Sequence, residues 1–146
     1  MRVMSDWGLN YKGELTLPLM GVRVAAGFPS PATDYMQEPI NLNEELIRHP
    51  SATFMVRVEG DSMVDVFIPN NALLIVDRSL NVKNNDIVLA SIDGEFTVKS
   101  YVVNGKGTFL YPANSKYKPI AITAEMNFVV FGVVTFIIVD VKDVKV

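Results

Sequence analysis

Apolar and polar residues alternate along the chain from about residue 52 onward, in short runs that turn residues separate. A period of two places successive side chains on opposite faces of a strand, whereas a helix repeats every 3.6 residues. Valine, isoleucine and phenylalanine, which favour strands, dominate these runs. The pattern predicts strands at residues 54–58, 72–77, 86–92, 95–103, 108–112 and 128–139.

The turn residues between these runs predict how the strands connect. Asp93-Gly94, between Ile92 and Glu95, is a two-residue hairpin sequence, because such turns need residues that tolerate a positive φ. Gly132 interrupts the last apolar run and predicts a bulge or a bend there. That run is shorter than the roughly 20 residues of a membrane-spanning helix, so a buried strand is expected. Many short strands with hairpin turns predict a mainly β, antiparallel and partly closed structure.

The N-terminal part of the chain lacks this regular alternation. Residues 1–26 show no sustained period, although short strands at 15–17 and 22–24 are conceivable, and we interpret the segment as a flexible arm. Residues 27–40 contain three prolines, which favour an extended linker over a helix.

One short helix is predicted at residues 41–48. Asn41 can cap its first turn, Glu44 stands at capping-box spacing from Asn41, and Pro50 marks the end. The expected organisation is therefore an arm at 1–26, a linker at 27–40 and a single catalytic β-domain at 41–146.

Composition narrows the class of protein. The chain has 146 residues, 49% of them hydrophobic, which is enough for one folded domain with a core. It contains no cysteine, which excludes disulfides and is compatible with the cytoplasm. A net charge of −3 argues against a broad basic surface, so we expect no direct sequence-specific DNA binding. The N-terminus lacks the continuous apolar core of a signal peptide, and no membrane association is expected.

Ser62 and Lys99 form a candidate catalytic pair. Ser62 follows Gly60, whose missing side chain permits a sharp turn at the end of a predicted strand. A serine hydroxyl is a weak nucleophile that needs a base, and a lysine can be that base only where its pKa falls below about 10.4. On residue type alone, a solvated turn serine and a solvated lysine on the polar face of a strand, beside Glu95 and Thr97, are the simpler explanation of the two positions.

Other polar residues suggest less chemistry. His49, the only histidine, follows the predicted helix and is interpreted as a structural residue at the helix C-terminus. Asp61, Asp65, Asp86 and Asp93 lie at turns, where aspartate commonly bonds backbone N–H groups. No metal-ligand spacing and no glycine-rich phosphate loop occurs, so neither a metal nor a cofactor is expected.

Three stretches carry a resemblance to a known family. They are Ala25-Ala26-Gly27-Phe28-Pro29-Ser30-Pro31-Ala32, Gly60-Asp61-Ser62-Met63 and Asp93-Gly94-Glu95-Phe96-Thr97-Val98-Lys99. They resemble the cleavage region and the two active-site blocks of the LexA/UmuD family of self-cleaving serine–lysine peptidases. The likeness continues through residues 46–53 and covers roughly residues 20–135 in the same order.

The resemblance implies a role for each matching residue. Ser62 is the expected nucleophile and Lys99 the expected general base, while Gly60 and Met63 are expected at the turn that stabilises the oxyanion. The expected scissile bond joins Ala26 to Gly27, two small residues that a tight pocket accepts. When the arm covers Ser62 and Lys99 it would exclude water, which favours the neutral form of the lysine.

The resemblance also implies a biological setting. Members of the UmuD branch act in SOS-response mutagenesis, and their self-cleavage is stimulated by RecA–single-stranded DNA filaments. The processed homodimer then joins a UmuC-type Y-family polymerase in translesion DNA synthesis. The same partners, a homodimer and a cytoplasmic location are therefore expected here.

Three alternatives remain at the level of sequence. A LexA-like transcriptional repressor would need a helix-turn-helix domain before the cleavage site, and residues 1–26 show no two helical patterns. A signal-peptidase relative would share the serine–lysine chemistry but normally carries a membrane anchor. A non-enzymatic β-domain that only binds partners would retain the fold without any cleavage.

Overall fold

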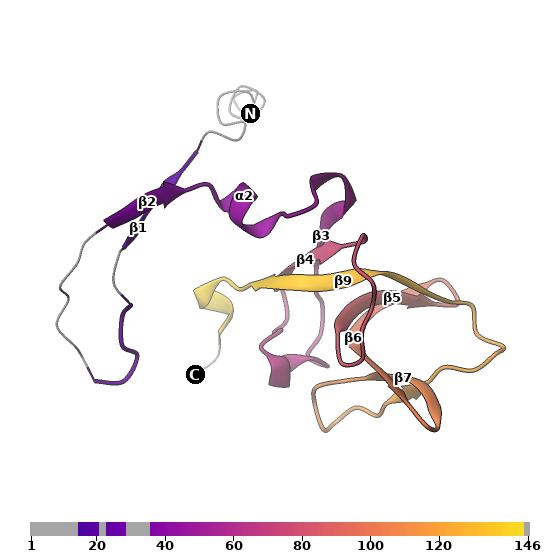
Figure 1. Ribbon diagram of the computed structural model, residues 1–146. Coiled ribbons are helices and arrows are strands. Elements are labelled where there is room, and N and C mark those ends of the chain that lie inside the picture. Colours follow the sequence, from indigo (N-terminus) through magenta and orange to yellow (C-terminus); the bar gives the residue numbers. More distant parts are fainter. Residues whose placement is uncertain (1–14, 21–22, 29–35, 145–146) are drawn as a thin grey trace, which may run out of the picture. The chain divides into compact units, whose positions relative to one another are not determined.

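The computed structural model describes residues 15–20, 23–28 and 36–144. The chain divides into two compact units, residues 1–48 and 49–146 (Figure 1). Most of the predicted arm and linker, at residues 1–14, 21–22 and 29–35, lies outside the described residues. The described strands and the short helix confirm a mainly β protein.

The first unit contains one strand pair and one helical turn. β1 (Leu17–Met20) pairs antiparallel with β2 (Met36–Ile40), and α2 (Leu42–Leu46) follows. The strand predicted at 15–17 instead starts at Leu17, and the described part of 22–24 is not a strand, because cross-strand pairing rather than local propensity sets these bounds. The last residues of the predicted linker are extended, and they are paired as β2.

Asn41 begins α2 as the sequence predicts. Its Oδ1 accepts the Asn43 N–H at 2.9 Å and the Glu44 N–H at 3.4 Å, which satisfies two backbone donors of the first turn. The helix is shorter than predicted, since Ile47 already has extended dihedral angles (φ −115°, ψ 102°). Within the described residues, α2 is the single α-helix.

The second unit is built on a seven-stranded antiparallel sheet with the order β3-β4-β9-β5-β6-β7-β8. The final long strand, β9, lies between β4 and β5 in the sheet, although these two strands follow one another along the chain (Figure 1). The six predicted strands are confirmed to within one residue at each end, and only the two-residue β8 was not predicted. Their bounds are β3 (Thr53–Arg57), β4 (Leu73–Asp77), β5 (Ile87–Ile92), β6 (Glu95–Asn104), β7 (Gly107–Tyr111), β8 (Ile120–Ala121) and β9 (Phe128–Ile138).

Both local predictions about turns and bulges are confirmed. Asp93 and Gly94 have φ of 51° and 88°, and Ile92 pairs with Glu95 across the hairpin. At Gly132 the pairing of β9 with β5 shifts by one residue, because Leu89 pairs with Gly132 while Ala90 pairs with Val130. Phe131 is the extra residue of this bulge.

The core lies on both faces of the sheet. β5 shows why: Leu89 packs in one buried cluster, whereas its neighbours Val88 and Ala90 pack in the other. The first cluster includes Met63, which is only 2% exposed and directly follows Ser62. Burial of Met63 therefore anchors the turn that carries the candidate nucleophile.

Candidate active site

The candidate nucleophile lies in a turn between β3 and the short 3₁₀ helix η2 (Val64–Val66). Gly60 has a φ of +100°, a conformation that L side chains rarely adopt, so the chain reverses direction there. The Gly60 N–H donates to the Asn70 Oδ1 at 2.7 Å. Gly60 therefore forms the turn before Ser62, and its N–H is already engaged with a side chain.

Lys99 reaches this turn from β6. Its Nζ lies 3.0 Å from the Ser62 Oγ, 2.7 Å from the Thr97 Oγ1 and 3.1 Å from the Val98 carbonyl oxygen. Thr97 and Lys99 point to the same side of β6, in agreement with the alternation predicted from sequence. The structure thus brings the predicted nucleophile and the predicted base into hydrogen-bond contact.

A cleft of about 370 Å³ surrounds the pair. Burial lowers the pKa of the half-buried Lys99 from its ordinary value, because partial desolvation penalises the ammonium. The cleft is lined by the end of β3, the Ser62 turn and the first half of β6, namely Val56, Arg57, Val58, Glu59, Ser62, Met63, Leu89, Phe96, Thr97, Val98 and Lys99.

The three partners of Lys99 prepare it for base chemistry. A protonated Nζ has three donors, and the structure supplies three acceptors. After loss of one proton, the two remaining N–H groups can stay with Thr97 and the Val98 carbonyl. The lone pair is then directed at the Ser62 Oγ, where it can accept the hydroxyl proton.

The structure adds residues that sequence reasoning missed. Thr97 accepts a hydrogen bond from Lys99, and Asn70 accepts one from the Gly60 N–H. The only sequence signal for Thr97 was its position two residues before Lys99, on the same face of the strand. A loop at residues 113–117 also bonds the Ser62 turn, and its sequence showed nothing more than a turn signal. Ala26 and Gly27 lie in the first unit, where both are exposed and form no helix or strand.

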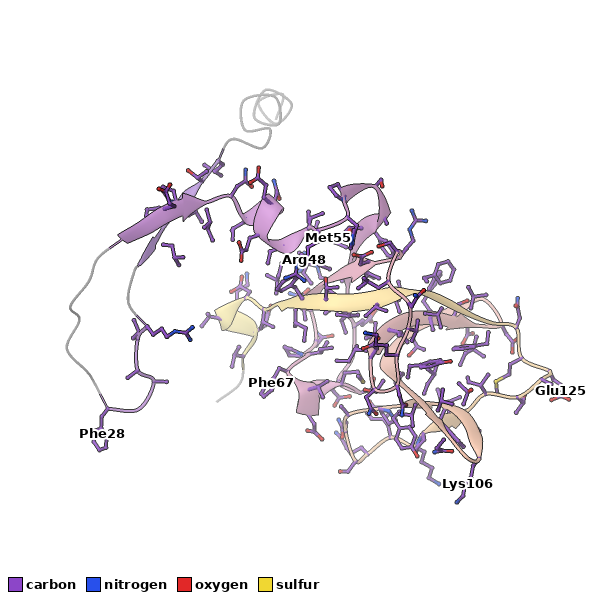
Figure 2. All side chains as sticks on the ribbon, in the orientation of Figure 1. Phe28, Arg48, Met55, Phe67, Lys106 and Glu125 are labelled. Carbon is purple, nitrogen blue, oxygen red and sulfur yellow. The ribbon has the colours of Figure 1, made fainter. Side chains whose placement is uncertain are left out.

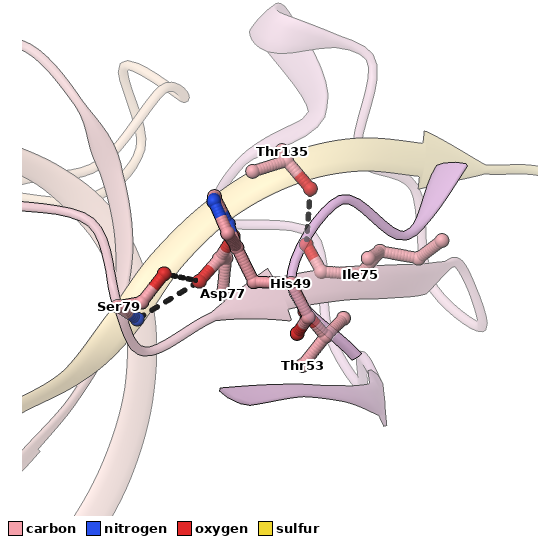
Figure 3. Close-up of polar contacts among 6 residues, drawn as sticks. All are labelled: His49, Thr53, Ile75, Asp77, Ser79 and Thr135. Carbon is pink, nitrogen blue, oxygen red and sulfur yellow. Dashed lines mark hydrogen bonds and ion pairs between the residues drawn. The ribbon is translucent and has the colours of Figure 1, made fainter. Parts of the chain in front are cut away.

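His49 lies in a different environment from the predicted helix C-terminus. α2 ends at Leu46, so His49 does not lie at a helix C-terminus; its Nδ1 is 2.5 Å from the Asp77 Oδ2 on β4. The other Asp77 oxygen accepts the Ser79 N–H at 2.8 Å and the Ser79 hydroxyl at 2.6 Å (Figure 3). In a catalytic triad the histidine lies between the serine and the aspartate, whereas here Asp77 lies between Ser79 and His49. His49 therefore cannot take the Ser79 hydroxyl proton, and this cluster is structural.

The lowered pKa of Asp77 predicts how the stability of the protein depends on pH in acid. Hydrogen bonds from Ser79, followed by that from His49, lower the pKa of Asp77 to about 2, against 3.8 without these contacts. Because the folded-state pKa is depressed, this contribution to stability is complete above about pH 4 and disappears as the pH falls to about 2. Asp77→Ala should lower the free energy of unfolding by about 1–3 kcal/mol near neutral pH, measured by urea denaturation, because it removes the hydrogen bonds that this buried carboxylate makes with Ser79 and His49.

The control for this prediction is Glu125→Ala, a carboxylate in an exposed position (Figure 2). Its stability should match that of the wild type at every pH. The difference between Asp77→Ala and wild type should shrink as the pH falls through the window from about 4 to about 2. A difference that stays constant through this window contradicts the assignment of the acid dependence to Asp77.

Neither a metal site nor a membrane helix is found among the described residues. No group of three or more histidine, cysteine, aspartate or glutamate side chains there could hold a metal ion. No helix in the described part of the chain is long and apolar enough to cross a membrane.

A turn serine in contact with a half-buried lysine is an arrangement that a serine peptidase can use, with the serine as nucleophile and the lysine as base. The fold and the site therefore point to the class of serine peptidases. The family model described as Peptidase S24-like matches residues 18–135. The chain belongs to this family, which confirms the family resemblance noted in the sequence.

Individual relatives are similar over most of the chain. Protein ImpA of Salmonella typhimurium is 41% identical over 128 residues, which cover 88% of this chain and 87% of ImpA. Protein SamA of Salmonella typhimurium strain LT2 is 44% identical over 120 residues, covering 82% of this chain and 83% of SamA. The LexA repressor of Shewanella piezotolerans is 38% identical over 109 residues, which cover 75% of this chain but only 52% of the repressor.

Proposed function

We propose that this protein is a self-cleaving serine peptidase in which Ser62 is the nucleophile and Lys99 the general base. The observation that carries the proposal is the 3.0 Å contact between the Lys99 Nζ and the Ser62 Oγ, inside a cleft that lowers the pKa of the lysine. Membership of the Peptidase S24-like family supports the same chemistry.

The reaction follows from these two groups. The neutral Lys99 amine takes the Ser62 hydroxyl proton while the Oγ attacks the carbonyl carbon of the scissile peptide, which gives a tetrahedral oxyanion. Collapse of this intermediate breaks the C–N bond, and the Lys99 ammonium returns its proton to the departing amine. Water, deprotonated by the same amine, then hydrolyses the acyl ester and regenerates Ser62.

The proposed substrate is the Ala26–Gly27 bond of the protein itself. Residues 23–28 are exposed and outside any helix or strand, so the segment can be offered to a peptidase in extended form. A Cβ placed on Gly27 would have open space around it, which indicates that Gly27 is not needed for packing in its own unit. Cleavage would release residues 1–26 as an arm and leave residues 27–146.

The proposed cellular role is SOS-response mutagenesis. The similarity to ImpA, at 41% identity over 88% of this chain and 87% of ImpA, supports this role. In this role a RecA–single-stranded DNA filament stimulates cleavage in the cytoplasm. The processed homodimer then acts with a UmuC-type Y-family polymerase in translesion synthesis.

Intact-mass spectrometry of the purified full-length chain tests the proposal. At about pH 7 and about pH 10, near the reference pKa of lysine, we expect a fragment beginning at Gly27 that forms faster at the higher pH. Addition of RecA, single-stranded DNA and a nucleotide should raise the rate at the lower pH. A chain that stays intact under all these conditions contradicts the proposed peptidase and favours a β-domain that only binds partners.

Bulky residues at the cleavage site should block processing. A double change of Ala26 and Gly27 to leucine is expected to abolish formation of the fragment, since a pocket for small residues cannot accept the larger side chains. The measurement is again intact mass, with Phe28→Leu as a neighbouring control that keeps the scissile pair. Continued cleavage between residues 26 and 27 in the double variant would show that the pocket does not select small residues.

A further inference from the structure

A loop that follows β7 holds the turn that carries Ser62. We call residues 113–117 the support loop. Its Ala113 N–H donates to the Ser62 carbonyl at 2.7 Å, and its Asn114 Nδ2 donates to the Asp61 carbonyl at 2.8 Å. The Asp65 N–H in turn donates to the Ala113 carbonyl at 2.8 Å, so the loop bonds the turn on both sides of the serine.

The support loop is itself well organised. The Asn114 Oδ1 accepts the Lys116 N–H at 3.0 Å, while the Tyr117 N–H donates to the Asn114 carbonyl at 3.0 Å. Ala113 packs against the same buried cluster that contains Met63. The half-buried Asn114 therefore links a structured loop to the Ser62 turn through one side chain, using its oxygen for the loop and its nitrogen for the turn.

A second contact joins the loop to the side chain before Ser62. The Tyr117 hydroxyl donates to the Asp61 Oδ1 at 2.5 Å, and the Lys116 Nζ lies 3.5 Å from the Asp61 Oδ2. The hydrogen bond from the Tyr117 hydroxyl lowers the pKa of Asp61 and raises the pKa of Tyr117. Asp61 is thus held to the loop by its side chain as well as by its carbonyl.

The geometry of the peptide bond relates these contacts to the direction of backbone N–H groups at the candidate nucleophile. In a trans peptide the C=O and the next N–H point in opposite directions within one plane, and the described chain has no cis bonds. Binding the Asp61 carbonyl to the loop therefore directs the Ser62 N–H away from the loop. The Met63 N–H instead faces Ile68, with which Met63 forms an isolated antiparallel bridge.

We propose that Asn114 is a positioning residue that orients the Ser62 N–H toward the oxyanion of the cleavage reaction. This inference rests on the proposed function, because it assigns a donor for the intermediate formed at Ser62. Asn114 makes no contact with the reacting atoms and acts through the Asp61 carbonyl. The Tyr117 hydroxyl supports the same orientation through the Asp61 side chain.

The test replaces the donor of Asn114 and keeps its shape. Asn114→Asp retains the oxygen that accepts the Lys116 N–H, so the loop keeps its own turn, but it cannot donate to the Asp61 carbonyl. Asn114→Ala removes the donor without adding a negative charge beside Asp61. Asn104→Asp is the matched control, because Asn104 accepts the Lys106 N–H at 2.8 Å in the same way, in the β6–β7 hairpin.

The expected result is a slower cleavage of the full-length chain. Both Asn114 variants should lower the rate constant by about 10- to 100-fold at every pH between about 7 and 10, as misplaced oxyanion donors do. The midpoint of the pH dependence should stay unchanged, since the loop does not bond Lys99. In the uncleavable Lys99→Ala background, amide exchange measured by NMR should become faster at Ser62 but not across the sheet.

The outcomes separate this inference from the proposed function. Wild-type rates in both Asn114 variants, with the wild-type chain cleaving, overturn the positioning role alone. So does a slowing that is accompanied by faster exchange throughout the sheet, because that marks a loss of fold. A wild-type chain that never cleaves overturns the proposed function and, with it, the positioning role.

Discussion

Replacement of Ser62 or Lys99 by alanine is expected to abolish self-cleavage while the fold stays intact. Ser62→Ala removes the oxygen that forms the acyl bond, and Lys99→Ala removes the only nitrogen found within hydrogen-bond distance of that oxygen among the described contacts. Loss of such groups lowers rates by several orders of magnitude in serine peptidases, on the order of 10⁴-fold or more. Intact-mass spectrometry over several days is the measurement.

The rate of self-cleavage is also expected to depend on pH. Neutral Lys99 is the active form, and burial lowers its pKa, so the cleavage rate should rise with pH and level off before the pH of an ordinary lysine, about 10.4. The lowered pKa also means that the folded state disfavours the ammonium. Below pH 7, Lys99→Ala should therefore not destabilise the protein in the way that removal of a salt-bridged lysine would.

Matched controls exclude general effects of losing a serine or a lysine. Ser51→Ala removes an exposed hydroxyl, and Lys106→Ala removes an ammonium at the tip of the β6–β7 hairpin (Figure 2). Both variants should cleave at the wild-type rate. Residual cleavage at Ala26–Gly27 in purified Ser62→Ala, without added wild type, is incompatible with Ser62 as the nucleophile.

Substitution of Gly132 should cause a large loss of stability. A Cβ at this position would lie 2.7 Å from the Val76 Cγ1 and 3.0 Å from the Asp77 carbonyl oxygen, beside the pairing of β9 with β4. Val76 is fully buried and Asp77 is held by the sheet, so neither can move freely. Gly132→Ala should cost about 1–3 kcal/mol of unfolding free energy by urea denaturation, and Gly132→Val more.

Gly105→Ala is the control for this prediction. A Cβ on Gly105 would meet nothing within 4 Å, and its φ is not positive, so the substitution should be neutral or slightly stabilising. Combining Gly132→Ala with Val76→Ala removes the atom that the new Cβ meets. The combined cost should be smaller than the sum of the two single costs, and strict additivity would show that the clash is not the cause.

Local patterns in the sequence determined most of the secondary structure. Alternation located the main strands, Asp93-Gly94 determined the hairpin between β5 and β6, and Gly132 marked the bulge. These features depend on neighbouring residues and on their φ preferences, so they can be read without the fold. The strands β2 and β8 were not predicted and β1 was predicted with other bounds, because pairing with a strand elsewhere in the chain, rather than local propensity, defines them.

The sequence by itself also determined the identity of the candidate pair, since its motifs named Ser62 and Lys99. Only the tertiary structure decided that their atoms meet, that Thr97 and the Val98 carbonyl hold the lysine, and that burial lowers its pKa. The partner of His49 and the bonds of the support loop were decided in the same way. The physical reason is that hydrogen bonds and desolvation depend on distances between strands, which the order of residues does not contain.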